Sequence, residues 1–207
     1  MRFEAEVRSQ AALRAVMGPP AARALDKELA ALDSHCRDFI ALSPFVLVGS
    51  SDGAGRVDVS PRGDAPGFVA VLDDRTLAIP ERPGNRRADT LSNVLRHPPL
   101  ALLFMIPGKA ETLRVGGEGL VVRDAWLRER LAVQGKAPEL VLVVRVARAF
   151  LHCARCALRS RLWELAAWPD VAGLASHARC LVDHARLAQP VEAVQAGLDE
   201  AYRTRLY

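Results

Sequence analysis

The sequence contains few lysines and few aromatic side chains. Only three of its 28 basic residues are lysines, at positions 27, 109 and 136, and aromatic residues make up 5% of the chain. The arginines are spread along the chain among 24 carboxylates, so the net charge of +4 indicates a solvated, mildly basic surface. Such a pattern disfavours nucleic-acid binding. A compact anion such as phosphate would need only two or three of these arginines.

Long apolar runs and secretion signals are also lacking. No uncharged apolar stretch approaches the length of a membrane span, and charges at the N-terminus interrupt the apolar run that a signal peptide requires. We therefore expect a cytoplasmic protein with no membrane segment and with four reduced thiols, Cys36, Cys153, Cys156 and Cys180. Cys153 and Cys156 form a single Cys-x-x-Cys pair, and a structural zinc site usually needs a second pair. We predict no metal site.

Several catalytic signatures are missing. The chain has neither a Walker-type loop nor a Rossmann glycine fingerprint, and no nucleophile–base pair of the hydrolase kind. A protein in which a bound cofactor carries the chemistry would fit this absence, because the chain then supplies binding and electrostatics. We identify no catalytic acid or base.

What is present is the composition of an ordinary folded domain, with half of the 207 residues hydrophobic and a quarter charged. Residues 1–42 form an N-terminal segment with helical periodicity, and the character changes to β-rich from residue 43. Residues 43–165 are expected to form the core, and residues 166–207 a C-terminal helical segment packed on it. We expect one domain overall.

The β-rich part contains a clear hairpin signal and several further strands. Phe45 begins an apolar run that leads into Asp52-Gly53, and a second run follows directly. A helix over 85–96, with Leu91, Val94 and Leu95 on one face, interrupts the strands. A doubly wound parallel sheet would require regular alternation of helices and strands, which is absent. The sequence favours a mainly β, α+β fold, a small closed or split β-barrel with flanking helices; the expected strands are 45–51, 56–60, 67–72, 75–79, 100–106, 112–123 and 140–150.

The segment after the fourth of these strands carries the clearest site pattern. A Pro-Gly turn precedes Asn85, and Arg86 and Arg87 fall in the expected first turn of the helix. Arginine is unusual there, because the positive end of the helix dipole prefers anions. A bound phosphate would resolve the conflict, since free N–H groups and two guanidinium groups can hold a dianion. A surface helix with solvated arginines is the alternative.

A second cluster lies upstream, where a strand ends in Ser-Pro-Arg-Gly. Ser60 and Arg62 would then lie at the mouth of the barrel. An ordinary strand exit with a solvated arginine is the alternative interpretation.

Ordered blocks of the sequence resemble the flavin-binding split-barrel family, and most of all a bacterial subgroup of proteins related to pyridoxamine 5′-phosphate oxidase. The resemblance covers about residues 40 to 165 and is specific because several blocks occur in order. The blocks are SDGAGRVDVSPRGDAPGFV (51–69), IPERPGNRRADTL (79–91), IPG (106–108), ETLRV (111–115) and FLHCARCALRSRLW (150–163).

The resemblance implies a homodimer that binds FMN in a groove between its subunits. In the family, residues at the positions of Asn85, Arg86 and Arg87 bind the FMN phosphate, and the residue at the position of Arg62 reaches the phosphate or the ribityl chain. A polar residue at the position of Thr112 contacts the flavin ring. The remaining residues that we expect near the cofactor are Ser60 at the barrel mouth, Ile79 and Pro80 through their backbone, and Arg159, Ser160 and Trp163 from the partner subunit.

These features predict an FMN-dependent oxidoreductase that transfers a hydride between a small molecule and flavin N5. The chain lacks the Arg-Leu-x-Pro type of ending found in true pyridoxamine 5′-phosphate oxidases, so we assign no substrate. Two alternatives stay open. One is a non-catalytic flavin- or haem-binding module, acting as a sensor, carrier or store. The other is a basic protein that binds nucleic acid, which the arginine pattern disfavours.

Overall fold

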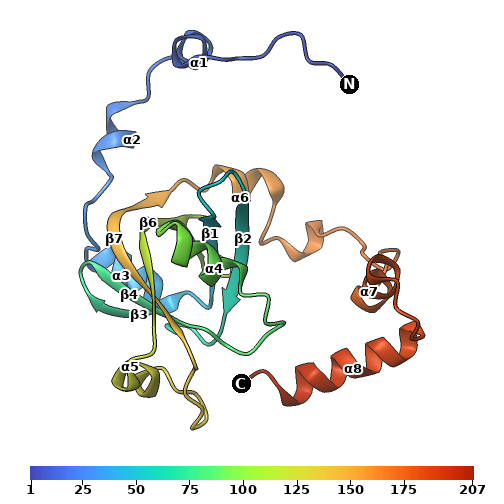
Figure 1. Cartoon of the computed structure of the whole chain (residues 1–207). Helices are drawn as coiled ribbons and strands as arrows, with labels where there is room; N and C mark the ends of the chain where they lie inside the picture. The colour runs from blue at the N-terminus through green and yellow to red at the C-terminus, as the bar shows by residue number, and fades with distance from the viewer.

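A computed structural model describes the whole chain, residues 1–207. Its centre is a seven-stranded sheet in the order β2-β1-β5-β6-β7-β4-β3, and every neighbouring pair is antiparallel. The sheet curls into a split β-barrel with helices around it (Figure 1), which confirms the α+β architecture expected from the sequence. The strands are β1 (Phe45–Ser51), β2 (Val57–Gly63), β3 (Ala70–Asp73), β4 (Thr76–Pro80), β5 (Pro99–Met105), β6 (Thr112–Val122) and β7 (Val141–His152).

Eight α-helices and one 3₁₀ turn accompany the barrel, and most of them lie outside the strand-rich part of the chain. α4 and α5 are the two that interrupt the strands. The helices are α1 (Gln10–Met17), α2 (Ala22–Asp26), α3 (Ser34–Leu42), α4 (Asp89–Arg96), α5 (Ala125–Arg130), α6 (Arg155–Ser160), α7 (His177–Ala185) and α8 (Val191–Thr204), and the 3₁₀ turn η1 spans Leu165–Ala167. No helix has the length and apolar character needed to cross a membrane.

The first hairpin forms as the Asp-Gly signal predicts. Ser51 pairs with Val57 at its closed end, and the Asp52 carboxylate accepts hydrogen bonds from the backbone N–H groups of Ala54 at 2.8 Å and Arg56 at 3.1 Å. These hydrogen bonds hold the pKa of Asp52 below its ordinary value. The turn therefore fixes the register that determines which side chains of β2 face the site.

The barrel interior is filled by alternate residues of its strands. Val46 and Val48 of β1, Phe104 of β5 and Leu113 of β6 are fully buried. α3 and α4 close the barrel with Ile40 and other apolar side chains that join the same cluster. Alternation with period two thus separates a continuous core from an outer face, as is typical of small barrels.

A β-bulge leaves Ala147 of β7 without a partner, where the register shifts between Gly116 and Gly117 of β6. A Cβ atom at Gly117 would lie 2.1 Å from the carbonyl oxygen of Arg145, so only glycine fits there. The bulge allows the two longest strands to wrap around the core.

The helix expected over 85–96 is shorter in the structure. α4 begins at Asp89 because Arg86 and Ala88 adopt left-handed backbone conformations, with φ of 61° and 54°, which a right-handed helix cannot contain. Leu95 was expected beside Leu91 on the buried face, and this was wrong: Leu95 is 74% exposed. The buried face is rotated toward Asn93, whose side-chain amide donates to the Ser50 hydroxyl at 3.0 Å.

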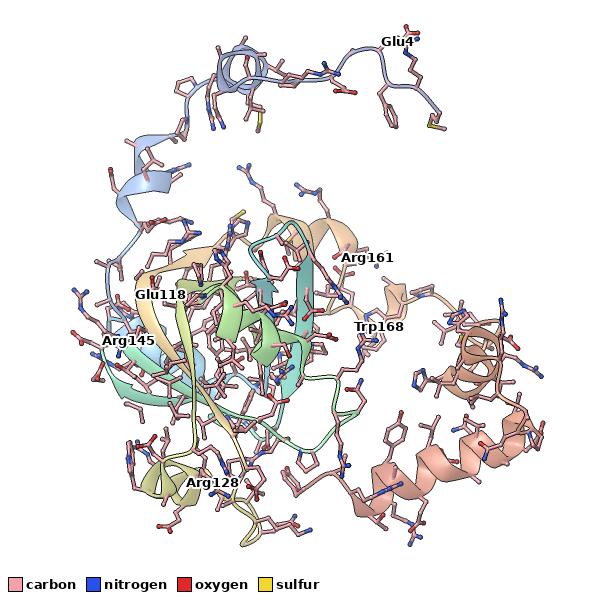
Figure 2. All side chains as sticks on the ribbon, in the orientation of Figure 1. Glu4, Glu118, Arg128, Arg145, Arg161 and Trp168 are labelled. Carbon is pink, nitrogen blue, oxygen red and sulfur yellow. The ribbon has the colours of Figure 1, made fainter.

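Both ends of the chain leave the barrel (Figure 1). Residues 1–28 form an arm in which α1 and α2 bury no residue, and Figure 2 shows the part around α1 apart from the barrel. At the end of the arm, the Lys27 ammonium donates to the Leu151 carbonyl at 2.6 Å. Leu29 anchors this arm through two backbone hydrogen bonds to Ala149, at 2.9 and 2.8 Å. At the other end, α7 and α8 pack on each other, whereas we expected residues 166–207 to pack along the core. Their apolar side chains meet in the helical hairpin itself, where Ala178 is fully buried.

Candidate functional site

Strand β2 lies at an edge of the sheet and brings the upstream cluster to the surface. Its side chains alternate between exposed and half-buried positions. Asp58, Ser60 and Arg62 therefore share one side of the strand, whereas Val57 and Val59 point to the other and are largely exposed. The two β2 residues predicted for the site, Ser60 and Arg62, thus lie on the same side of the strand, next to the loop that follows β4.

The guanidinium group of Arg62 is held by several neighbours. Its Nη1 donates to the Ser60 hydroxyl at 2.7 Å and to the Pro61 carbonyl at 3.0 Å. Its Nε and Nη2 both approach Oε2 of Glu81 at 3.1 Å. Since the Arg62 side chain is only 14% exposed, these contacts fix a cation at the mouth of the barrel.

The loop over 81–88 connects β4 to α4 and carries the three residues of the predicted phosphate motif. The Asn85 side-chain oxygen accepts a hydrogen bond from the Arg87 backbone at 3.0 Å, which forms an Asx turn. Arg87 donates to the Asp89 carboxylate at 2.7 Å, and this pairing raises the pKa of Arg87 and lowers that of Asp89. Arg86 forms no ion pair or side-chain hydrogen bond. Of the two arginines in the predicted motif, Arg87 is therefore paired and Arg86 is unpaired.

The start of α4 faces this loop without a capping side chain. Ala88 occupies the N-cap position and has no side-chain oxygen to accept from the first N–H groups of the helix. Thr90, in the first turn, is buried, and its hydroxyl lies 3.5 Å from an Asp58 carboxylate oxygen. The uncapped N–H groups make this end of α4 suited to an anion.

These pieces converge on one polar groove of about 400 Å³, hereafter the phosphate groove. Of the predicted site residues, Ser60, Arg62, Pro80, Asn85 and Arg87 line it. Arg86 lies on the opposite side of the same loop, where it lines a second cavity of about 570 Å³ that also contains Leu91, Lys136 and Tyr207. The sequence thus indicated most of one wall of the groove, and the loop separates it from a neighbouring cavity.

A buried ion pair joins the two segments that form the phosphate groove. Arg82 donates to the Asp64 carboxylate at 2.7 Å, and the Asp64 side chain is 2% exposed. Burial alone would raise the pKa of Asp64, but hydrogen bonds from Tyr207, the Ala65 backbone and Arg82 outweigh it and leave the pKa below its ordinary value. The sequence analysis missed this pair, because the residues are 18 positions apart and only the closed barrel brings them together.

An apolar groove of about 480 Å³ lies on the outer face of the barrel. Thr112 and Trp163 line it, together with Val59, Met105 and other residues of β1, β5 and α6. The Trp163 indole N–H donates to the Lys109 carbonyl at 2.8 Å, which holds the ring over this face. The structure therefore places Thr112 and Trp163 together, but on the side of β2 opposite to Ser60 and Arg62.

Four predicted residues line neither groove, and one of them, Arg86, lines the second cavity. Ile79 is buried in the core with 1% exposure, so only its backbone can approach a ligand. Arg159 is exposed on α6, and the Ser160 hydroxyl donates to the Ala157 carbonyl at 3.2 Å. In one subunit, α6 directs these two residues to the outside.

The match to known families covers the barrel. The family model described as pyridoxamine 5′-phosphate oxidase matches residues 32–153, which include all seven strands. No curated protein matches the chain.

Several solved structures resemble the barrel. HupZ of Group A Streptococcus is 15% identical, with a TM-score of 0.48 over 58% of this chain and 93% of that chain. An FMN-binding protein of Syntrophomonas wolfei is 13% identical, with a TM-score of 0.45 over 56% and 83%. A Clostridium acetobutylicum protein related to general stress protein 26, of the pyridoxinephosphate oxidase family, is 13% identical, with a TM-score of 0.43 over 57% and 85%.

At these identities and TM-scores the assignment depends on the family match alone. That match extends over more than half of the residues, from the end of the N-terminal arm through the whole barrel. The chain belongs to the pyridoxamine 5′-phosphate oxidase family.

Proposed function

We propose that this protein is a homodimeric FMN-dependent oxidoreductase that acts on a small molecule. The observation that carries the proposal is the phosphate groove, where Arg62, the loop over 81–88 and the uncapped start of α4 meet. Arginine side chains beside free helix N–H groups are the donors that a phosphate dianion prefers. This donor set fits the phosphate of FMN.

Each guanidinium group that lines the groove is paired with a carboxylate, and the pair of Arg82 with Asp64 is buried. Glu81 pairs with Arg62 and Asp89 with Arg87. A phosphate dianion would compete for the same donors and would carry more charge than either carboxylate. Arg87 is 64% exposed and can turn toward the groove at small cost, whereas Arg62 is already fixed there. We infer that Arg62 orients the phosphate and that Arg87 closes on it. Arg86 faces the second cavity in this structure, so its contact with the phosphate would require the loop to turn.

The placement of the two grooves supports a flavin held between two subunits. Ser60 and Arg62 lie on one side of β2, and the apolar groove with Thr112 and Trp163 opens on the other. One subunit presents these surfaces in different directions, so a second subunit would supply the wall that faces the ring system. The exposed side chains of Val57 and Val59 next to the apolar groove are apolar surface that a second copy would cover.

Bound FMN would supply two-electron chemistry by accepting or donating a hydride at its N5 atom. The residues of this chain would hold the phosphate, orient the ring and exclude water from it. Trp163 and the aliphatic side chains of the apolar groove provide a surface of the kind that accepts a flat aromatic ring, and the Thr112 hydroxyl provides a polar contact at its edge. No group in either groove is assigned a role in proton transfer.

The test is a visible absorption spectrum of the freshly purified protein, followed by identification of the cofactor released on denaturation. The proposal expects a flavin spectrum and about one FMN per subunit. Turnover of a reduced nicotinamide by the holoprotein would support the enzyme. A haem spectrum would favour the non-catalytic binding module. Colourless protein that takes up no added FMN would contradict the proposal.

A double variant tests the site itself. Arg86→Ala with Arg87→Ala should abolish FMN retention and leave the fold intact, because neither side chain is part of the core. The matched control is Arg8→Ala with Arg179→Ala, which removes two exposed arginines that pair with carboxylates outside the groove. If the Arg86→Ala, Arg87→Ala variant binds FMN as tightly as the wild type, the assignment of these residues to the FMN site is wrong.

A further inference from the structure

The last part of the chain forms a strap over residues 169–207. It leaves the barrel beyond α6 and η1, runs outward through α7 and returns through α8 (Figure 1). Figure 2 shows Trp168 where the strap departs, and its indole N–H donates to the Leu162 carbonyl at 2.9 Å. Within residues 169–207, only Tyr207 forms hydrogen bonds with the rest of the chain. No ion pair connects the strap to residues 1–168.

The place where Tyr207 docks is a built site with three contacts. Its phenol O–H donates to the Asp64 carboxylate at 2.7 Å. Its ring centroid lies 5.5 Å from the guanidinium carbon of Arg82, and its carbonyl oxygen accepts from the Lys136 ammonium at 3.0 Å. Because Asp64 is buried and charged, the hydrogen bond from Tyr207 is of the strong, charge-assisted kind.

The same residues shape the phosphate groove. Asp64 directly follows β2, which carries Arg62, and Arg82 opens the loop that leads to Asn85. Tyr207 also forms part of the second cavity, which shares Arg82 and Asn85 with the groove. A change in how Tyr207 sits would therefore change the hydrogen bonding of Asp64 and, through Arg82, the position of the loop.

We propose that Tyr207 is a latch that fastens the strap and thereby positions the loop over 81–88 for its ligand. The coupling to FMN depends on the proposed function, and the latch itself does not. Tyr207 is a positioning residue, since it acts on the phosphate groove through Asp64 and Arg82. Release of the latch would open the second cavity and loosen the loop without removing any donor from the groove.

The experiment compares Tyr207→Phe with Tyr202→Phe. The first change removes only the hydroxyl bonded to Asp64 and keeps the ring against Arg82. Tyr202 is an exposed tyrosine of α8 whose hydroxyl has no partner, so its variant is the matched control. Lys136→Ala removes a second contact of the latch from the barrel side. None of these changes touches the core, so all three variants should fold.

Two readouts separate the latch from its coupling to the groove. Limited trypsin cleavage of the apoprotein after Arg203 and Arg205 should be about tenfold faster in Tyr207→Phe, because a hydrogen bond to a charged group is lost. The dissociation rate of FMN, followed by recovery of flavin fluorescence, should rise by roughly the same factor. Lys136→Ala should change both rates in the same direction, and Tyr202→Phe should change neither.

Each outcome decides one part of the proposal. Unchanged cleavage in Tyr207→Phe would overturn the latch, whatever the flavin result. Faster cleavage with an unchanged FMN dissociation rate would overturn the coupling. If the wild-type protein retains no FMN, the proposed function fails, while the cleavage comparison still judges the latch.

Discussion

The two grooves differ in how they are made, although β2 contributes to both. The phosphate groove is polar, and its cations are held by carboxylates and by a loop with two left-handed residues. The apolar groove is the outer surface of regular strands with Trp163 laid over it. Period-two alternation places Arg62 in the first and Val59 in the second. One edge strand therefore serves two kinds of recognition, charge on one side and aromatic surface on the other.

The largest effect is expected from a core substitution that destabilises the barrel and so affects both grooves. Phe104 lies fully buried in the barrel that supports both of them. Phe104→Ala should lower the free energy of unfolding by about 3–5 kcal/mol, because a large cavity replaces the ring. Chemical denaturation followed by intrinsic fluorescence measures the change. The exposed Phe3 provides the control as Phe3→Ala, which should leave the stability unchanged.

The next effect concerns the phosphate groove alone. Arg62→Ala should weaken FMN binding about 30- to 150-fold and leave riboflavin binding nearly unchanged, since riboflavin lacks the phosphate. Titration of the apoprotein with each flavin, followed by fluorescence quenching, gives the ratio. Arg62→Lys keeps the charge and should recover part of the FMN affinity. An equal loss for both flavins would contradict a phosphate contact at Arg62.

For the apolar groove we expect a smaller loss of affinity that is equal for FMN and riboflavin. Trp163→Ala should weaken FMN and riboflavin by the same factor, about 5- to 30-fold, because the ring system is common to both. Trp126, an exposed tryptophan on α5 that lines neither groove, provides the control as Trp126→Ala. Selective loss of FMN in Trp163→Ala would place the phosphate, instead of the ring, near this face.

The smallest expected effect is a pH dependence of the stability of the fold, which arises from Asp64 beside the phosphate groove. The pKa of Asp64 is lowered in the folded protein, so this group stabilises the fold above its ordinary pKa of about 4. That contribution is lost as the pH falls through the lowered value, when protonation weakens the contacts with Tyr207 and Arg82. Thermal unfolding between about pH 6 and 3 should show the loss. Asp64→Asn should be less stable at neutral pH and should flatten this part of the profile.

The sequence predicted the barrel well because its strands are signalled locally. The Asp-Gly turn and the alternation of apolar residues fix the β1–β2 hairpin within a few positions. The start of α4 was predicted four residues too early, since nothing in Asn-Arg-Arg-Ala announces that Arg86 and Ala88 adopt left-handed conformations. Residues other than glycine adopt such conformations rarely, so a local pattern does not predict them.

The candidate site was predicted in part for a similar reason. Arg62, near the end of β2, meets Asn85 and Arg87 of the loop over 81–88, and the motif spacing indicates all three. The pair of Arg62 with Glu81 and the buried pair of Asp64 with Arg82 depend on closure of the barrel, whereas Arg87 and Asp89 are only two positions apart. Tyr207 lies 143 positions from Asp64, a separation that no sequence pattern connects.

The edge position of β2 also bears on how the protein behaves at high concentration. β2 pairs only with β1, so its outer backbone groups are free to join a strand of another molecule and to begin aggregation. Pro61 lies within the strand and brings no N–H group to such a ladder, and Asp58 and Arg62 add charges to the same strand. The strand that carries the phosphate donor is thus protected from uncontrolled polymerisation by the residue next to that donor.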